Sequence, residues 1–479
     1  MRSVRHGLVT AAALCLASCA AGPAYKPPDT PAMPPAFKEL GDWKPAQPQD
    51  EMPRGKWWGV YGDPALNALE EQVSVSNQSL KAAQAQYQQA RALARSARAA
   101  QFPQVTAGAS AAATDVSDNK PLRNPTSDTQ YTDYMQRADV SYEFDVWGRV
   151  AKTVSAATAI AQATAADLEA VRLSLQAELA QDYFLIRGLD SEQRIINASV
   201  AAYERALELT RNRHTGGLVS GVDVAQAETQ LQATRAQAID ITVRRAQLEH
   251  AIAALTGTTA TSFVLSPSPL ALPAPVVPAG LPADVLERRP DIAAAERRVA
   301  AANAQVGITQ SAFYPVLTLT GSAGFESASL GSWIKLASNF WSVAPAAAMT
   351  VFDGGRRRAA SDAALAGYER AQAVYRDTIL TAFREVEDNL AALRILAEEA
   401  RTQDAAVASA ERLLVLSNNR YTGGVSTYLE VVVAQTAALN NQRAAVNILS
   451  RRLTASVLLI KALGGGWSSG PSAPTAPGK

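Results

Sequence analysis

Residues 149–212 read RVAKTVSAATAIAQATAADLEAVRLSLQAELAQDYFLIRGLDSEQRIINASVAAYERALELTRN, without a proline and with a single glycine, Gly188. At 1.5 Å per residue, a helix over this stretch would be about 96 Å long. Its many alanines recur at helical spacing, which suits close packing of one helix against another. Residues 356–419 form a second stretch of the same kind. The sequence therefore predicts a mainly α-helical chain built around two very long helices.

The second stretch is part of a duplication of the whole pattern of expected helices, strands and turns. Each half reads as a helix, an aromatic-proline break, two candidate strands, a Phe-Asp turn with glycine, a very long helix, a Gly-Gly turn and a returning helix. Three landmarks recur in the same order at a nearly constant offset, which is 207 residues for the last pair. The pairs are Phe102-Pro103 with Tyr314-Pro315, Phe144-Asp145 with Phe352-Asp353, and Arg213-His214-Thr215-Gly216-Gly217 with Arg420-Tyr421-Thr422-Gly423-Gly424.

The duplication and the proline-rich stretches set the expected boundaries. We predict a signal peptide (1–18), a lipidated extended leader (19–56), a first repeat (57–257), a proline-rich linker (258–283), a second repeat (284–463) and a disordered tail (464–479). Strands are expected near 104–114, 134–144, 316–326 and 340–352. The long and returning helices are expected near 149–212, 222–256, 356–419 and 428–462.

The N-terminus has the pattern of a secretory signal. Arg2 and Arg5 precede a short apolar run that is too short to span a bilayer. The run ends in Leu16-Ala17-Ser18-Cys19, which resembles the lipobox of bacterial lipoproteins, so Cys19 is expected to become the lipidated first residue. Ala20 stands where an inner-membrane retention signal would place Asp, which favours the outer membrane. An acyl chain anchors a protein but does not make it span the membrane.

The candidate strand at 134–144 alternates with period two. Its odd positions from Arg137 to Glu143 are polar or charged and its even positions from Tyr134 to Phe144 are mostly apolar. A transmembrane strand and a half-buried soluble strand both show this pattern. If the strands span, four per chain cannot close a sheet, because an open edge in lipid would leave backbone groups unpaired. Spanning would therefore require an oligomer.

The composition provides few residues for a catalytic, metal-binding or polyanion-binding site. Removing Arg2 and Arg5 leaves 43 basic against 44 acidic residues, so no nucleic acid or other polyanionic partner is implied. Cys15 and Cys19 are the two cysteines, which leaves the mature chain no internal disulfide and no cysteine metal site. Neither His214 nor His250 lies in a catalytic motif, so no metal, cofactor or enzymatic activity is expected.

These features together resemble the TolC-like outer-membrane efflux proteins, in particular the lipoprotein branch that serves resistance-nodulation-division pumps. The match extends from the lipobox to about residue 463. Besides the landmarks above, it rests on Trp57-Trp58, Asp63-Pro64-Ala65-Leu66, Arg289-Pro290-Asp291-Ile292, Ala295-Glu296-Arg297 and Ala301-Ala302-Asn303-Ala304. The resemblance implies a homotrimer whose strands form one outer-membrane β-barrel that continues into a long periplasmic α-helical barrel. It also implies a periplasmic adaptor and an inner-membrane transporter as partners.

The resemblance also implies roles for residues at the helix tips. Arg420 and Tyr421 match positions that latch the closed tip, and Glu430 matches an acidic ring that narrows the pore and favours cations. Val433 stands where the family often has a second carboxylate, and Asp223 is the first-repeat equivalent of Glu430. The tip turns, with the expected adaptor contact, are formed by Gly216, Gly217, Gly423 and Gly424.

Three readings remain open at this point. The favoured function is passive export of small molecules through an exit duct. A type I secretion duct, which exports polypeptides, has the same fold, and only the lipobox and the Arg-Pro-Asp motif favour the small-molecule branch. A lipid-anchored periplasmic scaffold would use the same helices without crossing the membrane, and it would show no conductance.

Overall fold

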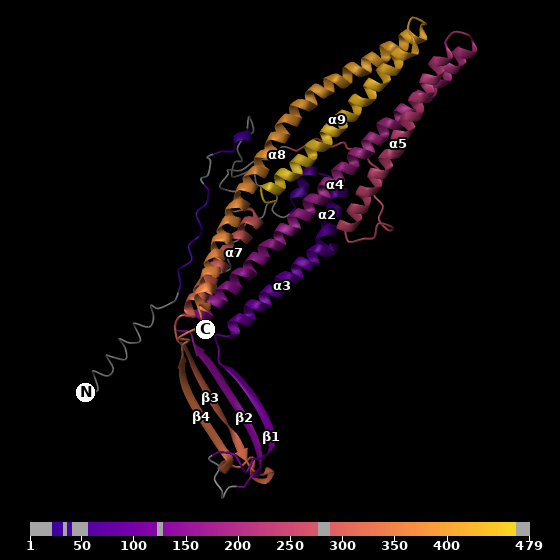
Figure 1. Cartoon of the computed structure of the whole chain (residues 1–479). Coiled ribbons are helices and arrows are strands. Elements are labelled where there is room, and N and C mark those ends of the chain that lie inside the picture. The colour runs from indigo at the N-terminus through magenta and orange to yellow at the C-terminus, as the bar shows by residue number, and fades with distance from the viewer. Residues whose placement is uncertain (1–21, 32–35, 41–55, 122–127, 276–287, 466–479) are drawn as a thin grey trace. The chain divides into compact units, whose positions relative to one another are not determined.

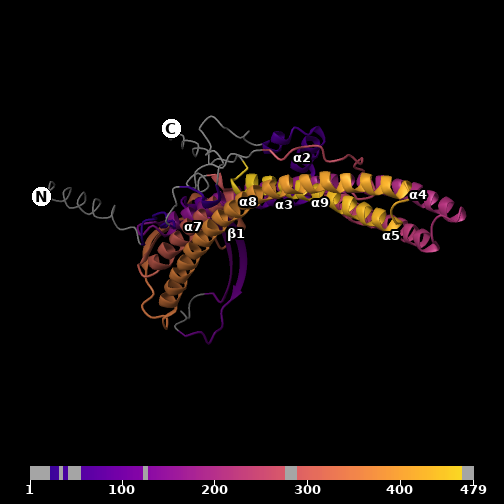
Figure 2. The same ribbon diagram turned by 90° about the horizontal axis from the view of Figure 1, so that it is seen from above.

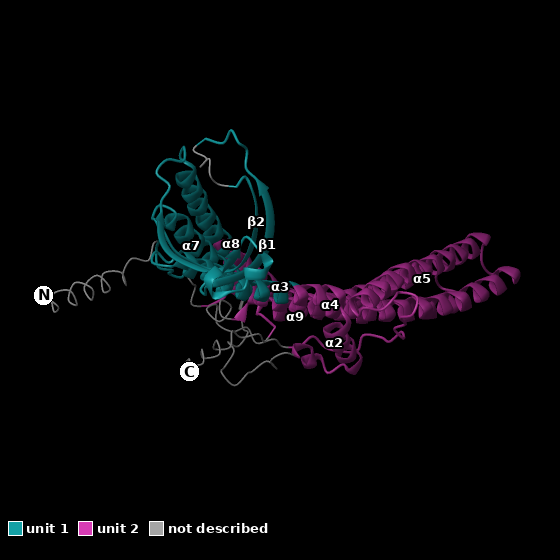
Figure 3. Ribbon diagram, turned by 90° about the horizontal axis from the view of Figure 1, so that it is seen from below, with its two compact units in different colours: residues 1–29, 86–164, 294–375 teal, residues 30–85, 165–293, 376–479 magenta. Residues whose placement is uncertain are grey.

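The computed structural model describes residues 22–31, 36–40, 56–121, 128–275 and 288–465. The expected signal peptide, Cys19 and residues 466–479 of the expected tail lie outside the described residues. The chain divides into two compact units, shown in Figure 3. Unit 1 comprises residues 1–29, 86–164 and 294–375, and unit 2 comprises 30–85, 165–293 and 376–479. Each unit therefore combines segments from both halves of the duplicated sequence.

Apart from one additional α-helix at the start of the first half, the described α-helices and strands follow one another in the same order in both halves. The α-helices are α2 (Pro64–Ser76), α3 (Gln78–Ala99), α4 (Arg149–Thr215), α5 (Gly221–Leu255), α7 (Pro290–Ser311), α8 (Arg356–Thr422) and α9 (Tyr428–Ala462). The strands are β1 (Gln104–Asp115), β2 (Gln130–Phe144), β3 (Val316–Ser327) and β4 (Asn339–Ala348). Short 3-10 helices are η1 (Lys38–Leu40), η2 (Trp57–Tyr61), η3 (Leu330–Ser332) and η4 (Leu336–Ser338).

Unit 1 contains one four-stranded antiparallel sheet in the order β1-β2-β3-β4 (Figure 1). The two hairpins of the two repeats join through β2 and β3, which pair from Tyr134↔Ser327 to Phe144↔Leu317. β1 and β4 each have a partner on one side only within the chain. Pro345, which cannot donate a ladder hydrogen bond, lies in the edge strand β4, where that loss is tolerated.

Neighbouring rows of the sheet have opposite character. One row across the four strands consists of Val105, Val140, Gly321 and Val343, and the next consists of Thr106, Asp139, Ser322 and Ser342. In the polar row, the Ser322 hydroxyl donates to the Asp139 carboxylate at 2.7 Å. Arg137 contacts the same carboxylate at 3.2 Å. The sheet thus has one apolar face and one face of paired polar groups.

Two strand boundaries differ from the expected ones because strand pairing sets them. β4 ends at Ala348 rather than near 352, since Ala348 pairs with Val316, the first residue of β3. Beyond that point no strand is available to pair with residues 349–352. β2 begins at Gln130 rather than 134, because β1 extends to Asp115 and pairs with it. The long helices α4 and α8 also extend three residues further than expected, into the Gly-Gly turns.

The two Phe-Asp landmarks cap the long helices. The Asp145 carboxylate accepts hydrogen bonds from the backbone N–H groups of Val150 and Ala151, at 2.9 and 2.7 Å. Asp353 accepts from the N–H groups of Gly355 and Arg357, at 3.0 and 3.2 Å. The first N–H groups of a helix have no partner within it, and a carboxylate there also interacts favourably with the helix dipole. This explains why the motif recurs once per repeat.

Unit 2 is built from two long helix pairs, α4 with α5 and α8 with α9, each closed by a Gly-Gly turn (Figures 1 and 2). The pairs meet in a buried cluster near the turns, whose members are Tyr203, Leu207, Ala227, Leu231, Tyr421, Tyr428 and Val431. Further from the turns, Gly188 of α4 lies against Ser450 of α9 so closely that a Cβ would fall 2.2 Å from the serine Oγ. Glycine therefore permits the close approach of the two helices here.

Two segments outside the α-helices are fixed against the long helices of unit 2 at equivalent positions. Residues 265–270 of the expected linker cross the first pair, where Arg187 donates to the Ser266 carbonyl at 2.6 Å and Asp190 accepts from the Ser268 N–H at 2.9 Å. Arg394, which is 207 residues after Arg187, binds Glu39 of the leader at 2.5 Å. The two arginines at equivalent positions thus bind different segments: Arg187 binds the linker and Arg394 binds the leader.

Among the described residues, no helix is both long and apolar enough to cross a membrane.

Candidate functional site at the helix tips

The two tip turns have the same backbone structure. In the first turn the Leu218 N–H donates to the Arg213 carbonyl at 2.8 Å, and in the second the Val425 N–H donates to the Arg420 carbonyl at 3.0 Å. A hydrogen bond from the N–H of residue i+5 to the carbonyl of residue i is the Schellman pattern, which ends a helix with a residue in the left-handed conformation. Gly217 and Gly424 supply that residue, with φ of 73° and 75°. All four glycines lie in the tip turns, and only the second glycine of each pair adopts a left-handed conformation.

Arg213 and Tyr421 connect the two turns. The Arg213 guanidinium donates from Nη1 to the Tyr421 carbonyl oxygen at 2.7 Å. Its Cζ also lies 4.7 Å from the centre of the Tyr421 ring, a cation–π distance. On the other side of the ring, the Tyr421 hydroxyl lies 3.2 Å from Thr210 Oγ1. We call these three residues the tip contact, and they join the first-repeat helix α4 to the end of α8.

The inner side of the tip contact is buried. Tyr421 is only 4% exposed and Tyr428 only 1%, and their rings meet edge to face with centroids 5.3 Å apart. Burial raises the pKa of Tyr428 to about 12, with a smaller contribution from Tyr421. The Tyr428 ring is thus a neutral packing element at physiological pH. A guanidinium held against such a surface is less exposed to competing water than one in bulk solvent.

Arg420 lies apart from the tip contact. Its side chain is 59% exposed and faces Glu430, itself 48% exposed, with Nε and Oε2 3.8 Å apart. That separation is long and the pair is open to solvent, so it contributes little to stability. Val433, one turn further along α9, is an exposed apolar side chain. The side chains of Arg420 and Tyr421 therefore have different partners, although the two residues are adjacent in sequence.

The first-repeat equivalents have local roles. Asp223 forms a capping box with Ser220 at the start of α5, in which the Ser220 N–H donates to its carboxylate at 3.0 Å. His214, the counterpart of Tyr421, contacts the Val219 carbonyl across its own turn through Nδ1 at 2.9 Å. Asp223 is thus occupied as a helix cap, and His214 closes its own turn instead of reaching the other repeat.

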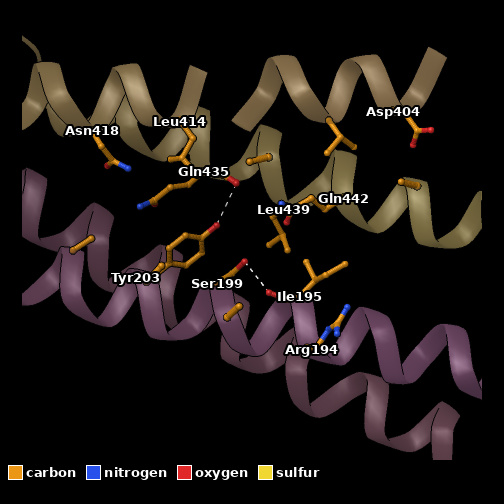
Figure 4. Close-up of a pocket in the computed structure, with 16 residues that line it drawn as sticks. Arg194, Ile195, Ser199, Tyr203, Asp404, Leu414, Asn418, Gln435, Leu439 and Gln442 are labelled. Atoms are coloured by element: carbon orange, nitrogen blue, oxygen red, sulfur yellow. Dashed lines mark hydrogen bonds between the residues drawn. The ribbon is translucent and has the colours of Figure 1, made fainter. Parts of the chain in front are cut away.

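A groove of about 720 Å³ lies behind the tip contact, between α4 on one side and α8 and α9 on the other. Figure 4 shows Tyr203 pointing across it from α4 to α9, where its hydroxyl donates to the Gln435 carbonyl at a long 3.3 Å. The two helix pairs are therefore not in continuous contact along this part of their length, and the tip contact lies beside the groove next to the buried cluster that contains Tyr203 and Tyr428.

Arg213 and Thr210 were not among the residues that the sequence indicated for a latch. Arg213 was visible in the duplication as the counterpart of Arg420. What the repeat pattern could not show is which arginine meets which aromatic ring. That depends on how the two helix pairs lie side by side.

Comparison with known proteins decides the family. The model of the family described as "Outer membrane efflux protein" matches the chain twice, over residues 69–258 and 281–465. The chain belongs to this family. The resemblance inferred from the sequence is thereby confirmed, and the protein is an outer-membrane efflux channel protein. The two matched segments correspond to the two halves of the duplication.

Individual relatives cover nearly the whole chain. The solvent efflux pump outer membrane protein SrpC of Pseudomonas putida is 33% identical over 464 residues, which is 95% of this chain and 97% of SrpC. The pyoverdine export outer membrane protein OpmQ of Pseudomonas aeruginosa is 33% identical over 86% of this chain and 88% of its own. Among solved structures, the outer-membrane channel OprN is similar with a TM-score of 0.86, 28% identity, and coverage of 93% of this chain and 99% of OprN.

Proposed function

We propose that three copies of the chain form the exit duct of a tripartite resistance-nodulation-division pump, which passively exports small molecules from the periplasm to the exterior. The observation that carries the proposal is the tip contact, which joins the two helix pairs beside an open groove at the end of the chain's longest helices. An opening that separates the tips has to break this contact and the buried cluster around Tyr421 and Tyr428. We propose that binding of a periplasmic adaptor at the glycine turns drives that separation.

The sheet supports the trimer. Within one chain β1 and β4 each have an unpaired edge, and an unpaired edge is not tolerated in lipid. Three copies would supply twelve strands, four from each, and joining β1 of one copy to β4 of the next would remove every edge. The apolar row of Val105, Val140 and Val343 would then face lipid, and the row containing Asp139 would face the lumen.

The leader supports a lipid anchor close to unit 1. The Pro23 carbonyl accepts from Lys152 at 3.3 Å and from Asn303 at 3.4 Å, so the start of the described leader is fixed to α4 and α7. Cys19 precedes Pro23 by four residues, which span at most about 14 Å when extended. We therefore propose that acylated Cys19 inserts in the membrane next to unit 1.

The printed names of the relatives favour small cargo. SrpC is described as serving solvent efflux and OpmQ pyoverdine export. We extend this small-molecule class to the present chain, which favours it over the polypeptide exporter left open by the sequence. We propose no catalytic step in the duct.

Single-channel recording of purified protein in planar bilayers tests the proposed function. We expect small currents from the wild type and larger ones after Arg420 and Tyr421 are both replaced by alanine, because the second turn then loses the ring contact with Arg213 and the hydroxyl contact with Thr210, while the backbone carbonyl of residue 421 can still accept from Arg213. An oligomer that is well folded by circular dichroism but conducts in neither form would favour the non-spanning scaffold. Currents that are equal in both forms would leave the duct intact and remove the latch.

Glu430→Gln is expected to lower the preference of the channel for cations. Each subunit places one half-exposed carboxylate at the start of α9, and Val433 adds no second charge. Removing three charges from a narrow ring should reduce the cation-to-anion permeability ratio by about twofold, as measured by reversal potentials in a salt gradient. Glu228→Gln is the matched control, because Glu228 is similarly exposed, at 46%, but pairs with Arg211. An unchanged ratio in Glu430→Gln would make this carboxylate an ordinary surface charge.

A further inference from the structure

The two connections at the far end of the sheet differ sharply in composition. The β1–β2 connection, residues 116–129, contains four charged residues and two prolines. The β3–β4 connection, residues 328–338, contains one charged residue, Lys335, together with Leu330, Trp333, Ile334 and Leu336. Leu330, Ile334 and Leu336 are 64%, 67% and 82% exposed. Three large apolar side chains are thus presented outward within seven residues.

The polar groups of the β3–β4 connection bond to one another instead of facing outward. The hydroxyls of Ser327 and Ser329 each lie 2.7 Å from the Ser332 hydroxyl, and the Ser338 hydroxyl donates to the Ser332 carbonyl at 2.8 Å. The Ser338 N–H donates to the Lys335 carbonyl at 2.8 Å. A segment whose serine hydroxyls bond to one another while its aliphatic side chains are exposed suits an environment poor in water.

The connection is also continuous with the apolar face of the sheet. Trp341 and Val343 of β4 point to that face and are 75% and 61% exposed. On the same face of the sheet, the Trp333 ring packs on the Tyr134 ring of β2 with the centroids 5.9 Å apart, which fixes the connection to the sheet. Aromatic rings and a lone lysine among apolar residues are typical of the interface between acyl chains and headgroups.

We propose that residues 328–338 lie in the outer interface of the membrane, with Leu330, Ile334 and Leu336 among lipid acyl chains and Lys335 at the level of the headgroup phosphates. The β3–β4 connection then contacts lipid, while residues 116–121 at the start of the more polar β1–β2 connection stay in water. The inference rests on the proposed membrane-spanning role of the sheet.

Site-specific fluorescence tests the placement. Cys15 and Cys19 are the two cysteines of the chain, and the proposed processing removes the first and acylates the second, so an introduced cysteine is labelled alone. An environment-sensitive nitrobenzoxadiazole label is placed on Leu336→Cys or Ile334→Cys in the full-length protein. The labelled protein is reconstituted in vesicles of phosphatidylethanolamine and phosphatidylglycerol that carry nitroxide-labelled lipid. Asn119→Cys is the matched control on the polar connection, and Val343→Cys reports on the strand.

We expect lipid nitroxides to quench the label at positions 336 and 334 at least about twofold more than at 119, with blue-shifted emission. Quenching at 336 by aqueous iodide but not by lipid would place the connection in water and overturn the inference. Protection from both quenchers would show burial against protein, including a neighbouring copy, and would also overturn it. If lipid nitroxides quench the label at position 343 in either of these two cases, the result still supports a membrane-spanning sheet, and only the placement of the β3–β4 connection is wrong. If position 343 is not quenched by lipid, the proposed function fails as well.

Discussion

Replacing Arg213 with alanine is expected to raise the open probability of the channel in planar bilayers by at least about tenfold. The substitution removes a charge-assisted hydrogen bond of 2.7 Å to the Tyr421 carbonyl and a cation–π contact of 4.7 Å to the Tyr421 ring. Such a hydrogen bond contributes about 1.5 kcal/mol or more and a half-buried cation–π contact about 0.5–1 kcal/mol. A loss of about 2 kcal/mol from the closed state alone shifts the equilibrium more than tenfold, because 1.4 kcal/mol corresponds to a factor of ten.

Two further variants distinguish this effect from a general loss of charge. Arg211→Ala removes an arginine two residues before Arg213 that pairs with Glu228 on the exposed surface, and it should leave the currents unchanged. Arg213→Lys keeps the charge but loses the planar group that lies over the ring, so an intermediate open probability is expected. If Arg213→Ala behaves like Arg211→Ala, the tip contact does not restrain the duct. The groove behind it would then be closed by other contacts.

Much of the fold could be predicted because its signals are local. A long stretch without proline, an aspartate before each long helix and a glycine after it are each visible within a few residues. The structure shows what each one does: Asp145 and Asp353 cap helix starts, and Gly217 and Gly424 take left-handed conformations. The duplication repeats each signal at a fixed offset, which makes the assignment more secure than one copy would.

The tip contact could not be predicted in the same way, because it joins residues about two hundred positions apart. Both repeats contain an arginine at the equivalent position, yet Arg213 contacts Tyr421 and Arg420 faces Glu430. The two arginines have different neighbours because position 421 is tyrosine while its counterpart, His214, closes its own turn. The end of β4 is a similar case, since the first residue of β3 sets it through strand pairing. Long-range packing decides both features.

Glu70 lies on the buried face of α2 although glutamate is usually a surface residue, and its spacing in the sequence agrees with this burial. Leu66, Leu69, Glu70 and Val73 of α2 have the spacing of one helix face, and all four are buried. Glu70 has no exposed surface, and neither carboxylate oxygen has a hydrogen-bond partner among the described residues. Burial raises the pKa of Glu70 to about 9. The carboxyl is therefore protonated in the folded protein at neutral pH.

Glu70→Gln is accordingly expected to stabilise the protein, and increasingly so as the pH rises. The folded-state pKa of about 9 lies above the ordinary pKa of 4.5 for a glutamate side chain, so between these values the folded state holds a proton that the unfolded state releases. Stability then falls with rising pH by up to about 1.4 kcal/mol per unit, or about 4 kcal/mol between pH 5 and pH 8. Glutamine has a similar shape and does not ionise, so it avoids this loss.

Thermal unfolding of wild type and Glu70→Gln from pH 5 to pH 8 measures the effect. The two midpoints should be close at pH 5, and the variant should gain on the wild type at each higher pH. Glu71→Gln is the control, because Glu71 is the neighbouring residue, 58% exposed, with Lys56 as its partner. An advantage of Glu70→Gln that does not depend on pH would mean that the carboxyl ionises freely in the folded protein. Water would then reach α2, and the packing of Leu66 and Val73 would not exclude it.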